Sequence, residues 1–491
     1  MNLKYFNNIC SVSRTILSRY KNSKHILSIS NLHITKPHPV FISQLSLLKK
    51  DKWEIDNQRI LVRIKDILKS IFNESADYYP NLDLKEFKNL NNEKCLFLSH
   101  IINTSHLNFK KDFYFGELPF FLSKKKYTTK CLLRNFTNKS SKSIFQDNKK
   151  NFNKNLIILS KSIKIFKELK LIFELIKTFL KLKKFKLIDK DLRRFLFNKS
   201  DFKSAASIFN NFKLLYQVEK VIKNFKPDHF FLTLEGHAWE KLLISQIKKN
   251  HPNIKIYAYQ FSTLTKYSNS IFLDLGKNYL PDVILNTGIY PRKKFLKSYK
   301  SKIKCINIGS NKFLSYRSDD KKTRNILVIP EGVNSETLRM LNFTIDAANK
   351  FSSLKFFFRF HPIIEKNLFF KNLYYQKKII PKNLIFSNKT FIQDLQSSKF
   401  ILYRGSASAV QGLGCGKIPL YLKFENEINI DPLFMIKKKF YINNLKDLQM
   451  IINDKKIKYK NFPNKFFPKK YFDKPQFQNL LKIMQKTNEK I

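Results

Sequence analysis

The sequence has 491 residues and a formal net charge of +56, and hydrophobic residues make up 43% of it. The length favours at least two domains, and the apolar content excludes a mainly disordered chain. The charge alone would suit a nucleic-acid-binding protein, but the lysines are spread along the whole chain, as in proteins from AT-rich genomes, so we expect no specific nucleic-acid partner.

The cysteines predict neither a disulfide framework nor a zinc site. They are five in number and far apart: Cys10, Cys95, Cys131, Cys305 and Cys415. This usage fits a reducing cytoplasm. No run approaches the roughly 18 apolar residues of a membrane span, and residues 1–13 lack the features of a signal peptide. We expect a cytoplasmic protein, either unattached or at the inner face of the cytoplasmic membrane.

The first part of the chain predicts an α/β domain. Residues 1–90 read as an N-terminal extension of unclear role, with helical spacing at 65–72. Short apolar segments then alternate with helical ones, which is typical of a parallel sheet covered on both faces. We expect a Rossmann-like domain over 91–312, with strands at 95–99, 155–160, 229–234, 254–259, 281–286 and 304–308, and helices at 162–189, 204–225 and 238–249.

The same rhythm returns after a polar linker at about 310–322. We expect a second Rossmann-like domain over 323–435, with strands at 325–329, 355–360, 383–386, 400–403 and 418–422, and helices at 335–351, 391–397 and 407–413. Residues 436–491 are expected to be a helical segment that crosses back to the first domain. Because ligands bind beyond the carboxyl ends of strands in such sheets, polar residues directly after a strand are the candidates for function.

The first candidate cluster is Glu235-Gly236-His237, with Trp239 and Glu240 one turn later. Gly236 permits a sharp turn after the strand, and either Glu235 or His237 is suited to take a proton from a hydroxyl group. The alternative is an ordinary helix N-terminus, where acidic residues suit the helix dipole.

Three further clusters follow strands of the second domain. His361-Pro362 places an imidazole where it can stabilise a leaving phosphate, whereas His251-Pro252 follows a helix and reads as structural. Small and hydroxyl residues at the next helix start predict an anion site or a simple N-cap, and they are Arg404, Gly405, Ser406 and Ser408. Glu331 and Gly332 are candidates for contacting the donor or for capping a helix.

Two other stretches have patterns associated with binding. Lys161–Arg194 has apolar residues at helical spacing among many lysines, which predicts either a membrane-surface helix or a solvated one. Asp189-Lys190-Asp191 matches the DxD pattern of some metal-binding sites. It lies in a charged helical region away from a strand end, so we expect no metal site there.

These motifs together resemble the bacterial GT-B sialyltransferases. Those enzymes have an acid-Gly motif, an HP motif and a serine motif, matched here by Glu235-Gly236, His361-Pro362, and Ser406 with Ser408. The match departs at Leu234, which stands where those enzymes have a second acid. The stretches 235–240 (EGHAWE) and 403–406 (YRGS) also look like surface-polysaccharide biosynthesis proteins of the capsule type.

The resemblance implies two Rossmann-like domains facing across a cleft, with the acceptor on the first and a nucleotide-sugar donor on the second. It implies inverting, metal-independent transfer to a glycan or lipid-linked acceptor, with Glu235 or His237 as base and His361 and the serines on the donor phosphate. No cofactor is expected beyond the donor. The alternatives are a nucleotide-sugar epimerase, a polyol-phosphate transferase, or a basic non-enzyme that binds nucleic acid or membrane.

Overall fold

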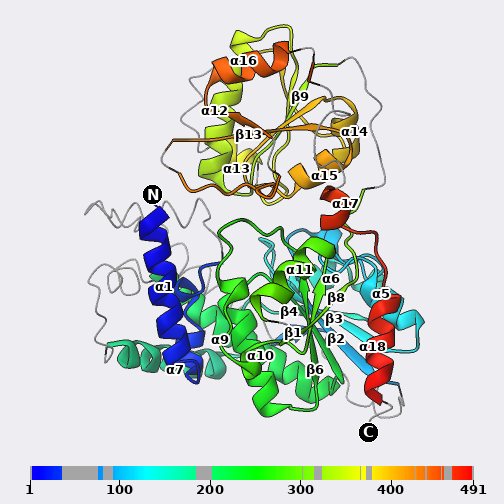
Figure 1. Ribbon diagram of the computed structural model, residues 1–491. Helices are drawn as coiled ribbons and strands as arrows, with labels where there is room; N and C mark the ends of the chain where they lie inside the picture. Colours follow the sequence, from blue (N-terminus) through cyan, green and yellow to red (C-terminus); the bar gives the residue numbers. More distant parts are fainter. Residues whose placement is uncertain are drawn as a thin grey trace.

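A computed structural model describes residues 3–35, 76–80, 92–183, 202–300, 302–314, 323–364, 366–371, 379–425, 427–436, 439–454, 456–457 and 467–488. The predicted helix at 65–72 lies outside these residues. The described chain forms two α/β domains, one above the other in Figure 1.

The first domain is built on one sheet. Within the described residues its strands have the order β1-β4-β3-β2-β5-β6-β7-β8, and all pairs are parallel except β1 with β4. The strands are β1 Tyr78–Tyr79, β2 Lys94–Ile101, β3 Thr128–Asn135, β4 Leu156–Leu159, β5 His229–Thr233, β6 Lys255–Gln260, β7 Val283–Asn286 and β8 Lys304–Asn307. From β2 onward this is the doubly wound order, with its switch point between β2 and β5.

Helices cover both faces of this sheet, which explains why its strands are apolar on both sides. Leu96 and Leu98 pack into one core, and Cys95 and Phe97 into the other. The helices are α1 Leu3–Arg19, α2 Lys24–Leu27, α5 Leu118–Lys124, α6 Ser141–Asp147, α7 Ile165–Lys183, α9 Phe202–Phe225, α10 Ala238–Asn250 and α11 Ile289–Ser298. Residues of α1 and α2 are buried in the first core beside α9 and α10, so the described start of the chain is part of this domain.

The second domain repeats the doubly wound arrangement. Its described strands are all parallel and have the order β11-β10-β9-β12-β13-β14. They are β9 Ile326–Ile329, β10 Phe356–Phe358, β11 Leu384–Phe386, β12 Phe400–Tyr403, β13 Ile418–Leu422 and β14 Phe440–Ile442. The accompanying helices are α12 Asn334–Lys350, α13 Lys366–Lys371, α14 Phe391–Gln396, α15 Ser408–Gly414 and α16 Leu445–Asn453. The predicted fold class, α/β with two Rossmann-like domains, is confirmed.

The expectation of a purely helical segment from residue 436 is wrong, because β14 extends the second sheet beyond β13. Two short helices follow, α17 Phe467–Tyr471 and α18 Gln478–Asn488. Tyr471 and Phe472 are buried in the second domain's core, while Leu480 and Met484 are buried in the first domain's. The chain therefore returns to the first domain, with α18 running along it in Figure 1.

The loop after β13 also joins the domains. Ile428 belongs to the second domain by sequence but is buried in a core of the first. Phe434 of the same loop has the Lys294 ammonium of α11 5.0 Å from its ring centre. The carboxyl end of the second sheet therefore has a loop that reaches the first domain.

Candidate active site

Glu235 and His237 form a carboxylate–imidazole pair at the switch point of the first sheet. They occupy the turn between β5 and α10, and His237 Nε2 lies 3.3 Å from Glu235 Oε2. Their side chains are 29% and 45% exposed, respectively. Burial opposes protonation of His237, but the hydrogen bond to Glu235 and the charge of Glu240 raise its pKa. The pair is accessible to a substrate and can hold a proton.

A buried carboxylate fixes this turn. Glu240 is fully buried, and its oxygens accept hydrogen bonds from the backbone N–H groups of Glu235 at 2.8 Å, Gly236 at 2.7 Å and His237 at 3.0 Å. Burial raises the pKa of Glu240 to about 7. Gly236 has φ +90°, and a Cβ there would meet the backbone of Ile271 at 2.8 Å, so a side chain is excluded. These constraints hold Glu235 and His237 at the carboxyl end of the sheet.

Aromatic rings line the same position, and of these the sequence analysis named Trp239 but missed His100 and Tyr114. His100, near the end of β2, is 7% exposed, with its ring edge-on to Tyr114 at 5.0 Å and to Trp239 at 5.6 Å. Burial lowers the pKa of His100 to about 3, so its imidazole is neutral. It directly follows the predicted strand at 95–99, so the strand-end rule applied there would have found it.

Tyr114 is held toward this cluster by a buried aspartate. Asp112 Oδ1 accepts hydrogen bonds from Ser99 Oγ at 3.0 Å, Tyr114 N at 2.8 Å and Phe115 N at 2.7 Å. Burial and the nearby charge of Glu235 raise the pKa of Tyr114, which keeps its hydroxyl protonated. The Tyr114 ring therefore adjoins His100 with its phenol in the protonated form.

In the second domain, three strand-end loops meet. A Cβ on Gly332, after β9, would lie 2.7 Å from Nδ1 of His361, after β10. A Cβ on Gly405, after β12, would overlap the carboxylate of Glu331. The structure thus brings the predicted residues Glu331, Gly332, His361 and Gly405 together, although they come from three separate segments.

Ser406 and Ser408 stand at the start of α15 and are partly exposed. The helix N-cap is Ala407, and Ser408 N donates to Ser406 Oγ at a long 3.4 Å. The N-cap position is therefore not occupied by serine, and both hydroxyls remain predicted phosphate contacts.

The environment of Arg404 argues against the predicted phosphate contact. Its side chain is 2% exposed, with Nε paired to Glu336, Nη2 2.6 Å from Glu427 Oε2, and Nη1 donating to Leu422 O at 3.0 Å. The guanidinium is thus buried against two carboxylates of the protein and a backbone carbonyl, and Glu427 is also paired with Arg339. Arg404 instead connects α12 to the loop after β13.

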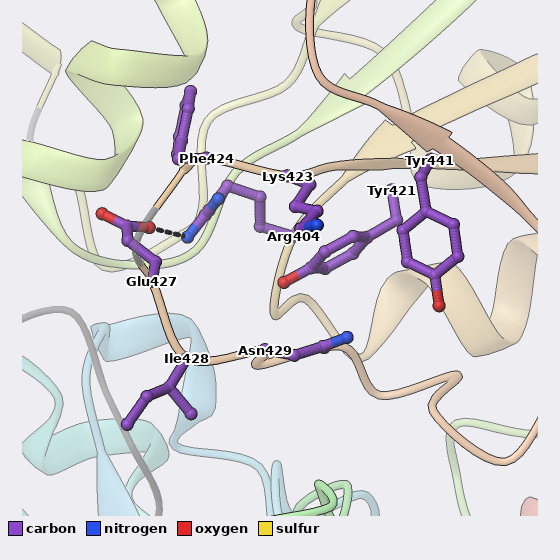
Figure 2. A pocket seen from close by; sticks show the side chains of 8 residues that line it. All are labelled: Arg404, Tyr421, Lys423, Phe424, Glu427, Ile428, Asn429 and Tyr441. Atoms are coloured by element: carbon purple, nitrogen blue, oxygen red, sulfur yellow. Dashed lines mark hydrogen bonds and ion pairs between the residues drawn. The ribbon is translucent and has the colours of Figure 1, made fainter. Parts of the chain in front are cut away.

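Beside Arg404 lies a pocket of about 230 Å³, shown in Figure 2. It is lined by Arg404, Tyr421, Lys423, Phe424, Glu427, Ile428, Asn429 and Tyr441. Phe424 stacks on the guanidinium at 4.3 Å, and Tyr421 and Tyr441 present their rings on the other side. The pocket adjoins the loop that reaches the first domain, so it lies at the junction of the two domains.

Within the described residues, no three His, Cys, Asp or Glu side chains are grouped to hold a metal ion. The motif Asp189-Lys190-Asp191 lies outside them. Among the described helices, none has both the length and the apolar character needed to cross a bilayer.

No protein-family model matches the sequence, and no curated protein does. Solved structures match over most of the chain. MnaA of S. aureus, in a co-structure with UDP, has 11% identity and a TM-score of 0.47, over 81% of this chain and 98% of that one. UDP-GlcNAc 2-epimerase from Neisseria meningitidis has 12% identity and a TM-score of 0.43, over 80% and 100%. The glycosyltransferase SnogD from Streptomyces nogalater has 10% identity and a TM-score of 0.39, over 74% and 91%. The matches thus include a glycosyltransferase and an epimerase.

Proposed function

We propose that this chain is an inverting, metal-independent glycosyltransferase that moves a sugar from a nucleotide donor to a glycan or lipid-linked acceptor. The observation that carries the proposal is the Glu235–His237 pair, held by buried Glu240 at the switch point of the first sheet. Ligands of doubly wound sheets bind at that point, and a carboxylate there is suited to general-base catalysis.

Glu235 is the proposed base. One of its oxygens faces His237, and a carboxylate has several lone-pair positions, so it can accept a substrate proton while bound to the imidazole. The acceptor hydroxyl gives its proton to Glu235, and its oxygen forms the new bond to the anomeric carbon. The bond from that carbon to the nucleotide phosphate breaks, and the electron pair leaves with the phosphate. Attack from the face opposite the leaving group inverts the anomeric centre.

His361, Ser406 and Ser408 are the proposed contacts of the departing phosphate. His361 lies against Gly332 at the end of the second sheet, where an imidazole and backbone N–H groups can stabilise developing negative charge. Because of the motif resemblance, the first donor to test is a CMP-sugar of the sialic-acid type. The donor specificity rests on that resemblance alone.

The test is nucleotide release from CMP-, UDP- and GDP-sugars, with and without glycan and lipid-linked acceptors, in the presence of a metal chelator. A transferase releases nucleotide when an acceptor is present and forms a sugar–acceptor product. An epimerase converts the sugar without any acceptor, and a polyol-phosphate transferase releases CMP from a CDP-polyol donor when an acceptor is present.

Glu235→Gln should lower the rate of product formation by about 10²–10⁴-fold, and the matched control Glu219→Gln on α9 should leave it unchanged. Glu219 is also a partly exposed glutamate of the first domain, so the control repeats the same chemical change away from the site. Product formation by the Glu235→Gln protein at the wild-type rate would refute the assignment of the base.

A further inference from the structure

Helix α7 exposes a continuous apolar face. Six of its side chains are between 44% and 82% exposed: Ile165, Phe166, Leu169, Ile172, Phe173 and Ile176. At 100° per residue they fall within an arc of roughly 120°. We call this set the α7 stripe. Scattered exposed apolar residues are common on proteins, but a set aligned along three turns of one helix marks a binding surface.

The opposite side of α7 is fixed to the first domain. Leu171 packs against the core, and Glu168 accepts a hydrogen bond from Ile163 N at 3.0 Å. Glu174 forms ion pairs with Lys24 of α2 at 3.3 Å and with His25 at 3.5 Å. The helix thus already has its buried face, and folding of the described chain leaves the stripe in solvent.

The charges around the stripe have one sign. Lys164, Lys167, Lys170 and Lys177 are all exposed. Glu168 is 4% exposed and Glu174 is partly buried and ion-paired, so the solvent side of the described helix surface is apolar and cationic. Lys177 Nζ lies 4.6 Å from the Phe173 ring centre, which places its stem along the stripe with the charge at the edge.

We propose that α7 docks this protein on an anionic phospholipid bilayer, lying in the plane of the interface. The stripe would enter the boundary between headgroups and acyl chains, and the flanking lysines would meet the phosphates. A second copy of the chain fits this surface less well. A symmetric dimer through the stripe would set the same lysines against one another, and the one carboxylate beside them, Glu174 at 4.0 Å from Lys177, is already shared with Lys24 of α2.

The position of α7 is compatible with docking during the reaction. Figure 1 shows it at the outer side of the first domain, beside the lower end of α1 and away from the second domain. A bilayer against the stripe would therefore leave the junction of the domains open. The inference does not depend on the proposed transferase activity, because it rests on a different surface.

The test is sedimentation of the full chain with vesicles of phosphatidylcholine alone or mixed with phosphatidylglycerol. The net charge of +56 will itself attract anionic vesicles, so the decisive variants change the stripe without changing charge. Phe166→Ser/Phe173→Ser should weaken partitioning onto the mixed vesicles by at least about tenfold, because two large apolar groups no longer enter the interface. The control Ile379→Ser/Met450→Ser removes two residues that are 90% and 66% exposed elsewhere and should bind as wild type.

Lys170→Gln/Lys177→Gln should weaken binding to the mixed vesicles by roughly thirtyfold, since two lysines near an anionic surface together contribute about 2 kcal/mol. Lys293→Gln/Lys297→Gln on α11 removes the same charge at another exposed site and should have a smaller effect. Melting curves confirm that each variant folds.

Two results would overturn the proposal. One is unchanged vesicle binding by the folded Phe166→Ser/Phe173→Ser protein. The other is a wild-type dimer in light scattering, without vesicles, that the same double substitution converts to a monomer. The second result would assign the stripe to another copy of the chain.

Discussion

The two strand-end clusters differ in how they are built. In the first domain, Glu235, His237 and their anchor Glu240 come from six consecutive residues, and the pair stays partly exposed. In the second domain, three loops that are far apart in the sequence meet. A deeply buried ion pair there joins Arg404 to Glu336. The first arrangement keeps reactive groups accessible, whereas much of the second cluster's charge holds the domain together. We therefore expect substitutions to cost activity in the first cluster and stability in the charged part of the second.

The largest effect is expected for Glu235→Gln. The amide cannot accept the acceptor's proton, so kcat should fall by about 10²–10⁴-fold. The folding free energy should change little, because the side chain is 29% exposed. Steady-state kinetics and urea unfolding on the same preparation separate the two effects. A large loss of stability with little loss of kcat would mean that Glu235 supports the fold and not the reaction, contrary to the expected difference between the clusters.

Arg404→Ala should show the opposite behaviour. It leaves Glu336 buried without its main counter-charge, and burial already raises the pKa of that carboxyl. Breaking a buried pair in this way costs about 3–5 kcal/mol of unfolding free energy. Urea unfolding measures the loss, and Glu219→Gln is a control with no expected change. A loss below about 1 kcal/mol would mean that Arg404 has a role other than support of the fold, such as binding a ligand.

A smaller effect concerns acid stability and is confined to the first domain. His100 and His33 are buried, and burial lowers the pKa of each to about 3. In the unfolded chain a histidine takes up a proton near pH 6.5, so the unfolded state binds more protons as the pH falls. The unfolding free energy should then decrease by about 1.4 kcal/mol per pH unit for each histidine below that pH.

The measurement is the slope of unfolding free energy against pH, from about 7 to 5, for wild type and His100→Asn. The unfolding free energy of the variant should depend less steeply on pH, because one buried histidine no longer contributes to the slope. This holds whatever the stability of the variant at neutral pH. Equal slopes would show that His100 is protonated in the folded protein.

Sequence patterns predicted most of the alternation of strands and helices, because a parallel strand covered on both faces is a short apolar run. They missed β3, whose segment Thr128–Asn135 mixes polar and apolar residues. They also predicted the Glu235 cluster, since its residues are contiguous. The extent of the second sheet was missed, because β14 has the partly exposed pattern of an edge strand, with Tyr441 41% exposed. The partners of Arg404 could not be foreseen, because Glu336 and Glu427 lie 68 residues before and 23 residues after it. Only the folded chain brings such charges together.

The most direct test of the central claim is the thermal shift of wild type and His361→Ala with CMP, CDP, UDP and GDP. Binding at 100 times Kd stabilises a protein by about 2.7 kcal/mol, which gives a clear melting shift. The account predicts that at least one nucleotide raises the melting temperature of wild type, with CMP tested first, and that the shift is reduced for His361→Ala. If none of the nucleotides stabilises the wild-type protein, the transferase proposal is contradicted.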